Sequence, residues 1–312
     1  MHLRDLLAEY PQQPAHGVPD WMLGYYKRHS ISFADGLTDV QTHVCWFQSR
    51  HFTIDLRLPL EAQQVSAKPL GLYSAEELQV LANYEGWQAL CSWEGGVLSW
   101  HTDTSFQVHN RWPEPGVVQR IGNCMIEFAP SGAYVEDWRL QSSAAGPLIG
   151  LRLLEDKALD SGVVHHRGGG LIVCGDHAAL VLGRADPLVS ETPMRDLVAR
   201  NAQDSTWLKR AFNFETSVAS GSLNQGFNVH LSTAPARIGQ PLIPLDGFEC
   251  LADGKHVVQS LVIDGIARER LFVIDTLEPT VSYAQSTGFT DSAAQWYARE
   301  SPTLSRYTQA LF

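Results

Sequence analysis

The sequence contains no run of about 18 consecutive apolar residues, so we expect no membrane-spanning helix. It contains no CxxC pair, and its five cysteines show no metal-ligand spacing, which predicts reduced thiols in a cytoplasmic protein. The first residues, MHLRDLLAEYPQQP, lack the apolar core of a signal peptide. Basic residues are few, 23 against 34 acidic ones, and the net charge of -11 disfavours nucleic acid and anionic membranes as partners.

The motifs of nucleotide, metal and serine chemistry are also missing. Gly168, Gly169 and Gly170 precede a strand-like run instead of opening a helix, so we interpret them as a flexible connection into a hairpin rather than a phosphate loop. The segment ASGSL at 219–223 is not a nucleophile elbow, and the histidines show no zinc spacing. We therefore expect no cofactor and no metal.

Short runs that alternate apolar and polar residues dominate the chain. Examples are THVCWFQ, FTIDLRL, CMIEF, AYVEDWRL and HVVQSLVI, and the Asp-Gly pairs at 253–254 and 264–265 mark tight hairpin turns. So many short strands predict a mainly β protein of antiparallel, barrel-like lobes, lipocalin-like or calycin-like, with a few short helices. The stretch QSSAAGP at 141–147 predicts a boundary between an N-terminal lobe, 1–145, and a C-terminal lobe, 146–312.

Three segments favour helices. SAEELQVLANYEG begins with Ser74 as N-cap, Glu77 as the capping-box partner and Gly86 as the stop. Weaker patterns cover 204–212 and DSAAQWYARE near the end of the sequence.

The first hairpin of interest joins THVCWFQ to FTIDLRL. If Ser49 to His51 form the turn, Trp46 faces Ile54 and Cys45 faces Asp55. The Trp46 face is then apolar, and we expect it to pack on the core. Asp55 and Arg57 would border a cavity mouth or solvent, where they bind each other or present a guanidinium to an anionic ligand; a solvated ion pair is the alternative.

The second hairpin, CMIEFAPSGAYVEDW, carries two carboxylates. A turn at 129–132 places Glu127 opposite Tyr134 and makes Glu136 its diagonal neighbour, with Trp138 on the same face. If this face points into a barrel, burial and mutual repulsion raise one carboxyl pKa, as an acid/base pair requires. An ordinary polar outer face is the alternative.

A third motif, WHTDTSF, places His101 and Asp103 two residues apart on one face of a strand. An aspartate that orients a histidine is a common catalytic arrangement, although the same pair is common in turns. Trp100 would point the opposite way.

Several segments resemble a group of uncharacterised bacterial proteins with lipocalin-like, calycin-type barrels. The likeness covers most of the chain and rests on a W-x-Q, a D-x-R-x-P, a W-H and an E-x-W strand, matched by Trp46 and Gln48, Asp55 and Arg57, Trp100 and His101, and Glu136 and Trp138. The resemblance implies antiparallel barrels with an interior cavity and no established chemistry.

Three functions remain open. In a binding module, the barrel holds a small, largely apolar ligand whose polar or anionic end is fixed by Arg57 or His101; the wall residues are Trp46, Asp55, Trp100, Asp103, Tyr134 and Trp138. In a cofactor-independent lyase, isomerase or cyclase, Glu127 or Glu136 is the base and His101 or Tyr134 the acid. The third is a structural or interaction protein. The expected partner is a small molecule, and the sequence does not define the oligomeric state.

Overall fold

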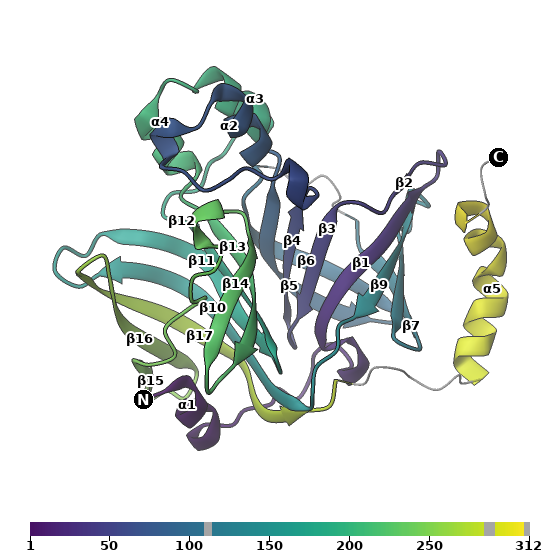
Figure 1. The fold of residues 1–312 in the computed structure, drawn as a ribbon. Helices are drawn as coiled ribbons and strands as arrows, with labels where there is room; N and C mark the ends of the chain where they lie inside the picture. The colour runs from purple at the N-terminus through teal and green to yellow at the C-terminus, as the bar shows by residue number, and fades with distance from the viewer. Residues whose placement is uncertain (109–113, 284–290, 309–312) are drawn as a thin grey trace.

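A computed structural model describes residues 1–108, 114–283 and 291–308 (Figure 1). Strands of the first half form one antiparallel sheet in which β1 pairs with both β3 and β9, so eight strands close into a barrel and β2 extends β1. This closure fits a calycin-type barrel. The strands are β1 (Gly24–Phe33), β2 (Thr38–Asp39), β3 (His43–Gln48), β4 (Phe52–Leu58), β5 (Glu85–Glu94), β6 (Val97–Ser105), β7 (Gly116–Ile121), β8 (Cys124–Phe128) and β9 (Tyr134–Leu140).

The second half forms an eight-stranded antiparallel sheet in the order β14-β13-β12-β11-β10-β17-β16-β15. Its inner face encloses an apolar core that includes Phe227, Phe248 and Phe272. The change of sheet falls between Leu140 and Gly146; that the two halves are separate domains stays a prediction. The strands are β10 (Gly146–Ala158), β11 (Val164–Cys174), β12 (His177–Arg184), β13 (Glu215–Ser222), β14 (Gly226–Ser232), β15 (Phe248–Cys250), β16 (His256–Ile263) and β17 (Ile266–Val281).

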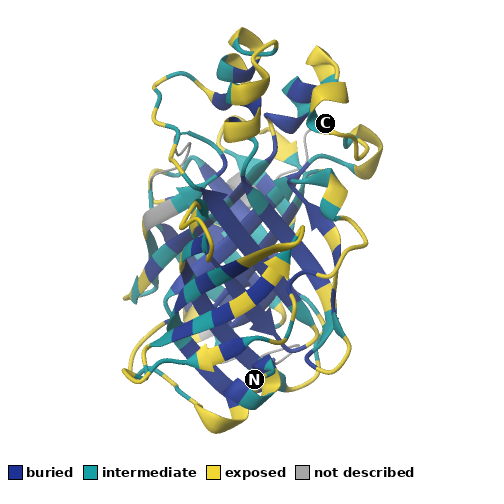
Figure 2. Cartoon of the chain, turned by 90° about the vertical axis from the view of Figure 1, so that its left-hand side faces the viewer, coloured by how far each residue is buried: buried dark blue, intermediate teal, exposed yellow. Residues whose placement is uncertain are grey.

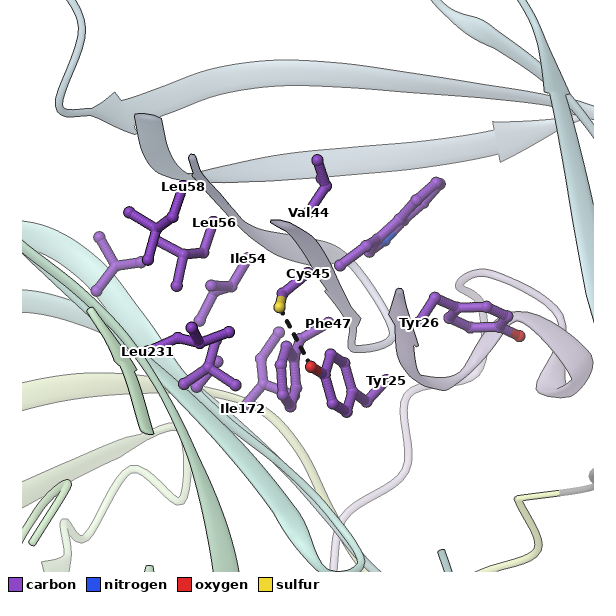
Figure 3. Close-up of a cluster of buried hydrophobic side chains, with 14 of the residues drawn as sticks. Tyr25, Tyr26, Val44, Cys45, Phe47, Ile54, Leu56, Leu58, Ile172 and Leu231 are labelled. Carbon is purple, nitrogen blue, oxygen red and sulfur yellow. Dashed lines mark hydrogen bonds between the residues drawn. The ribbon is translucent and has the colours of Figure 1, made fainter. Parts of the chain in front are cut away.

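The two sheets pack through the outer face of the β3–β4 hairpin. Figure 3 shows Phe47 and Ile54 among apolar side chains that include Ile172 and Leu231 of the second sheet. Large parts of both sheets are therefore buried on both faces (Figure 2). The outer face of the first barrel is apolar here because it is covered by protein, and the inner face is free to carry polar groups.

The predicted register of this hairpin is wrong by one residue. Trp46 pairs with Asp55 and Phe47 with Ile54, so Trp46 and Asp55 share the inner face. The turn residues are held from outside, because Arg50 binds Glu278 with both carboxylate oxygens and Ser49 donates to Asp275 at 2.6 Å. These contacts come from a strand more than 200 residues away in the sequence, so local turn chemistry does not reveal them.

Several short helices and one longer helix flank the sheets. The helix α2 (Ala75–Leu81) begins at the predicted capping box of Ser74, but it ends at Leu81 and Gly86 lies in β5. The other predicted helices are confirmed as α4 (Ser205–Ala211) and α5 (Asp291–Thr308). The structure adds α1 (Leu3–Glu9), α3 (Met194–Arg200) and 3-10 turns at Asp20–Met22, Glu61–Gln63, Leu70–Leu72 and Pro235–Arg237.

Glycine positions account for one predicted turn and one wrong prediction. Asp264 and Gly265 have φ angles of 51° and 78°, which confirms the tight turn between β16 and β17. Gly168 and Gly169 also have positive φ, but they lie inside β11, so the predicted flexible connection is wrong. A Cβ on Gly169 would meet the Val181 carbonyl oxygen at 2.2 Å, so the close approach of the neighbouring strand requires glycine.

All five cysteines are free thiols. Across the described ranges, no helix has the length and apolar character needed to cross a bilayer.

Candidate functional site

Tryptophans form a plug in the middle of the first barrel. Trp46 meets Trp138 edge to face at a centroid distance of 4.9 Å, and Trp100 lies 5.8 Å from Trp46. Trp46 and Trp138 are almost fully buried. Ligand space therefore lies at an end of this barrel rather than along its whole axis.

The polar ends of these rings are satisfied inside the plug. Trp46 Nε1 donates to Gln48 Oε1 at 2.9 Å, Thr53 Oγ1 donates to the same oxygen at 2.8 Å, and Trp100 Nε1 donates to Thr53 Oγ1 at 3.2 Å. A buried indole N–H without an acceptor is costly, so this network fixes the rotamers of the rings.

Glu127 and Glu136 lie next to the tryptophan plug and are directly opposed on β8 and β9. The strand register pairs Glu127 with Glu136 instead of with Tyr134, a shift of two residues from the prediction. Because the shift is an even number, the residues predicted to share a face still share it. Both glutamates are 3% exposed. Directly opposed residues have Cβ atoms about 5 Å apart, closer than the expected diagonal placement.

Glu127 is held by neutral donors. Its Oε1 accepts from the Tyr134 hydroxyl at 3.2 Å and its Oε2 from Trp138 Nε1 at 3.1 Å. Burial and the negative charge of Glu136 raise the pKa of Glu127 to about 8, against smaller opposing effects of Arg57 and the two donors. Burial is also the main reason that the pKa of Tyr134 is raised. Glu127 is therefore protonated at neutral pH and ionises just above it.

Glu136 is bound by a cation. Its Oε1 accepts from Arg28 Nη1 at 3.0 Å, and Arg28 Nη2 donates to Asp39 Oδ2 at 2.6 Å. The Arg28 side chain is 5% exposed. One guanidinium thus joins the strand that closes the barrel, β1, to β9 and β2.

Asp55 and Arg57 form the second ion pair of the interior. Arg57 Nε donates to Asp55 Oδ1 at 2.9 Å, and the side chains are 22% and 3% exposed, respectively. Burial raises the pKa of Asp55, while the charge of Arg57 opposes the rise. The expectation that this pair borders the cavity mouth or solvent is half right: Arg57 reaches the mouth, and Asp55 is buried behind it.

A cavity of about 580 Å³ opens at this end of the barrel. Its volume lies in the range of small-molecule sites. One part of the wall is apolar, with side chains from β1, β4 and α2, and another part is charged. The lining residues are Arg28, Ile31, Phe33, Asp39, Thr42, Arg57, Leu58, Pro59, Gln63, Val80, Asn83 and Glu85.

The structure brings most of the predicted site residues together and leaves one outside. Glu127, Glu136 and Tyr134 lie in the interior with Trp46, Asp55, Arg57, Trp100 and Trp138. His101 is exposed and bonds Ser92 Oγ at 2.8 Å, away from the carboxylates. Asp103 lies in β6, and its side chain is outside the described residues. A register shift between Ala89 and Cys91 in the β5–β6 pairing interrupts the alternation on which the His101–Asp103 prediction relied.

Sequence reasoning missed Arg28, Asp39 and Glu85. Arg28 follows the inward-facing Tyr26 by two residues, so alternation along β1 was a usable signal. The pairing of β1 with β9, which places Arg28 beside Glu136, had no signal in a single sequence.

In the described part of the chain, no three His, Cys, Asp or Glu residues group as a metal site would require. No protein-family model and no curated protein matches the chain. Among solved structures, the crystal structure of the uncharacterized protein YLR301w from Saccharomyces cerevisiae is similar over 80% of this chain and 97% of its own, with 13% sequence identity and a TM-score of 0.41.

Proposed function

We propose that the first barrel binds a small, partly apolar molecule whose polar end is cationic or rich in hydrogen-bond donors. The observation that carries the proposal is the cavity of about 580 Å³, because two arginines of its wall, Arg28 and Arg57, are bound to the buried carboxylates Glu136 and Asp55. The apolar part of the wall, including Ile31, Phe33 and Val80, would hold a short hydrocarbon portion.

The charge balance supports a cationic end over the anionic end considered from the sequence. Arg28 and Arg57 are already bound to Asp39, Glu136 and Asp55, so an anion would have to displace these carboxylates. Two guanidiniums thus face three carboxylates even when Glu85 and the protonatable Glu127 are left out of the count. The excess of negative charge in a partly buried wall favours a cation.

Matched ligands test the proposal. We expect hexylamine to raise the melting temperature of the protein more than hexanol, and hexanol more than hexanoate, at constant ionic strength, because the three probes share one chain and differ in the end group. Calorimetric titration of the best probe then gives its affinity. Equal or stronger stabilisation by hexanoate would contradict the proposed charge preference.

Two matched variants test whether hexylamine binds in this cavity. Val80→Trp adds a large ring to the cavity wall and is expected to abolish the stabilisation by hexylamine. Val262→Trp makes the same change at a 69% exposed position of β16 and is expected to leave it unchanged. Loss in both variants, or in neither, would contradict binding at this cavity.

Acid/base catalysis in the same barrel is the second candidate, because Glu127 has a pKa of about 8 and faces Glu136. Glu127 does not line the cavity, which favours binding as the first proposal. If the second function holds, Glu127→Gln retains ligand affinity and abolishes turnover of the bound compound, as followed by mass spectrometry.

A further inference from the structure

One arginine connects the cavity of the first barrel to the two buried glutamates. Arg28 lines the cavity, and its Nη1 donates to Glu136 Oε1 at 3.0 Å. Its Nη2 donates at 2.6 Å to Asp39, which lines the cavity as well. Glu136 in turn is the direct cross-strand partner of Glu127. A series of charged groups therefore leads from the cavity wall to Glu127.

The opposed glutamates favour a state in which one of them is protonated. Both residues are 3% exposed, and directly opposed residues have Cβ atoms about 5 Å apart, so two negative charges there repel each other. Glu136 has a cation, Arg28, as its partner. Glu127 accepts from two neutral donors, Tyr134 and Trp138. The proton is therefore held by Glu127, in agreement with its raised pKa of about 8.

The surroundings of Glu127 differ from strand to strand. On β7 its neighbour is Gly116, where a Cβ would lie 2.8 Å from Glu127 Oε1, so this side presents backbone and no charge. On β4, the charge of Arg57 favours ionisation of Glu127. On β9, burial raises the pKa of Tyr134 and keeps its hydroxyl neutral. The remaining charged groups next to these neighbours are Glu136, Arg28, Asp55 and Glu85.

We propose that binding of a cation in the cavity releases the proton of Glu127 to the solvent, so that the cation and the proton compete. This inference rests on the proposed function, because it concerns the regulation of the same site. The O–H bond of the Glu127 carboxyl group breaks, its electron pair stays on the carboxylate, and the buffer takes up the proton.

Two effects of a bound cation favour the ionised form of Glu127. The cation adds positive charge near the glutamate pair, which offsets their mutual repulsion. A cation that binds Asp39 also competes for this carboxylate with Arg28, and the guanidinium is then more fully available to Glu136. Both effects lower the free energy of a second negative charge in the pair.

The expected strength of this coupling depends on the separation of the charges. Arg28 and Glu136 lie between Asp39 and Glu127, so we place the cation roughly 10 Å from Glu127; with an effective dielectric constant of ~20, it lowers the pKa of Glu127 by about one unit. The same coupling acts on the cation, because linkage is reciprocal. The affinity for the cation therefore rises with pH as Glu127 loses its proton.

Calorimetric titration with hexylamine counts the released protons. Titrations at pH 7.5 in phosphate and in Hepes, at equal ionic strength, differ in the heat of buffer ionisation, and this difference gives the number of protons taken up by the buffer. We expect roughly half a proton for each hexylamine bound, and roughly eightfold tighter binding at pH 9 than at pH 6. An alkylammonium group resembles a lysine side chain and keeps its charge to about pH 10, so the ligand accounts for neither result.

Three variants assign the proton to a side chain. Glu127→Gln is expected to abolish the release and to bind hexylamine with one affinity at pH 6 and pH 9, because glutamine does not ionise. Tyr134→Phe removes a hydrogen bond to the ionised carboxylate and is expected to move the affinity change to higher pH. The matched control is Glu249→Gln at an exposed position of β15, which should release as many protons as the unmodified protein.

The possible outcomes separate this inference from the proposed function. Binding of hexylamine without proton release, or with an affinity that is equal at pH 6 and pH 9, overturns the inference and leaves the proposed function in place. Release that persists in Glu127→Gln also overturns it, because another group then supplies the proton. Absence of hexylamine binding at every pH overturns the proposed function and this inference with it. The unmodified protein alone decides the first outcome, so that result does not depend on the folding of a variant.

Discussion

Replacement of Glu127 by glutamine should change the pH dependence of stability in a defined way. Glu127 is buried, faces Glu136 and accepts hydrogen bonds from Tyr134 and Trp138. Glutamine has the same shape and keeps one oxygen acceptor, but it cannot ionise. The change therefore removes the titration and leaves the packing in place.

The size of the expected change in stability follows from the folded-state pKa and the ordinary pKa of Glu127. The folded-state pKa of Glu127 is about 8 and its ordinary value is 4.5, so the folded chain binds this proton more tightly than the unfolded chain. The stabilisation is complete below pH 4.5 and is lost as the pH rises from 4.5 to 8. At ~1.4 kcal/mol for each pH unit, the loss is roughly 3 kcal/mol by neutral pH and roughly 5 kcal/mol above pH 8.

The glutamine variant carries an opposite, pH-independent cost of about 1 kcal/mol, because one of the two donors loses its acceptor. We expect Glu127→Gln to be slightly less stable than the unmodified protein near pH 5 and more stable by about 3 kcal/mol near pH 8.5. The assay is urea unfolding followed by tryptophan fluorescence at these two pH values. Urea keeps the ionic strength constant.

The control is Glu249→Gln, an exposed carboxylate of β15, which should give the same difference in stability from the unmodified protein at both pH values. A difference between Glu127→Gln and the unmodified protein that does not change with pH would refute the assignment of a raised pKa to Glu127.

Three further changes test the packing around the site. Arg57→Met should lower the free energy of unfolding by about 3 kcal/mol, because it leaves the Asp55 carboxylate buried without its cation; adding Asp55→Asn should restore at least half, and no restoration would argue against the pair. Gly150→Ala places a Cβ 2.3 Å from Ser49 Oγ and should cost about 2 kcal/mol in urea unfolding, whereas Gly71→Ala, with open space around its Cβ, should be neutral; equal effects would contradict the account of the sheet interface. Trp296→Ala removes a 5% exposed ring that packs α5 on the barrel and should speed amide hydrogen exchange throughout that helix, while unchanged exchange would show that α5 is held by other contacts.

Much of the fold could be predicted from local patterns. Alternation of apolar and polar residues identified the strands, and the Asp-Gly pair at 264–265 marked a hairpin because positive φ angles favour those residues. The capping box at Ser74 located the start of α2 for the same kind of local reason. These signals depend on a few neighbouring residues, so one sequence is enough to read them.

The candidate site could be predicted only in part, because pairing between distant strands decides which face points inwards. Alternation placed Glu127, Glu136 and Trp138 on one face, and that face lies inside the barrel. The apolar outer face of β3 and β4 is buried by the second sheet, so the rule that an apolar face points into its own barrel gave the right direction for Trp46 and the wrong one for Ile54. The partner of Glu136, Arg28, comes from the closing strand 108 residues away and carries no local signal.

The most direct test of the central claim is native mass spectrometry of the protein purified from its own host, with Val80→Trp prepared in parallel. We predict one small molecule per chain in the unmodified protein, basic or rich in hydrogen-bond donors once released and identified, and none in the variant. The same molecule at the same occupancy in both proteins would contradict binding in the cavity of the first barrel.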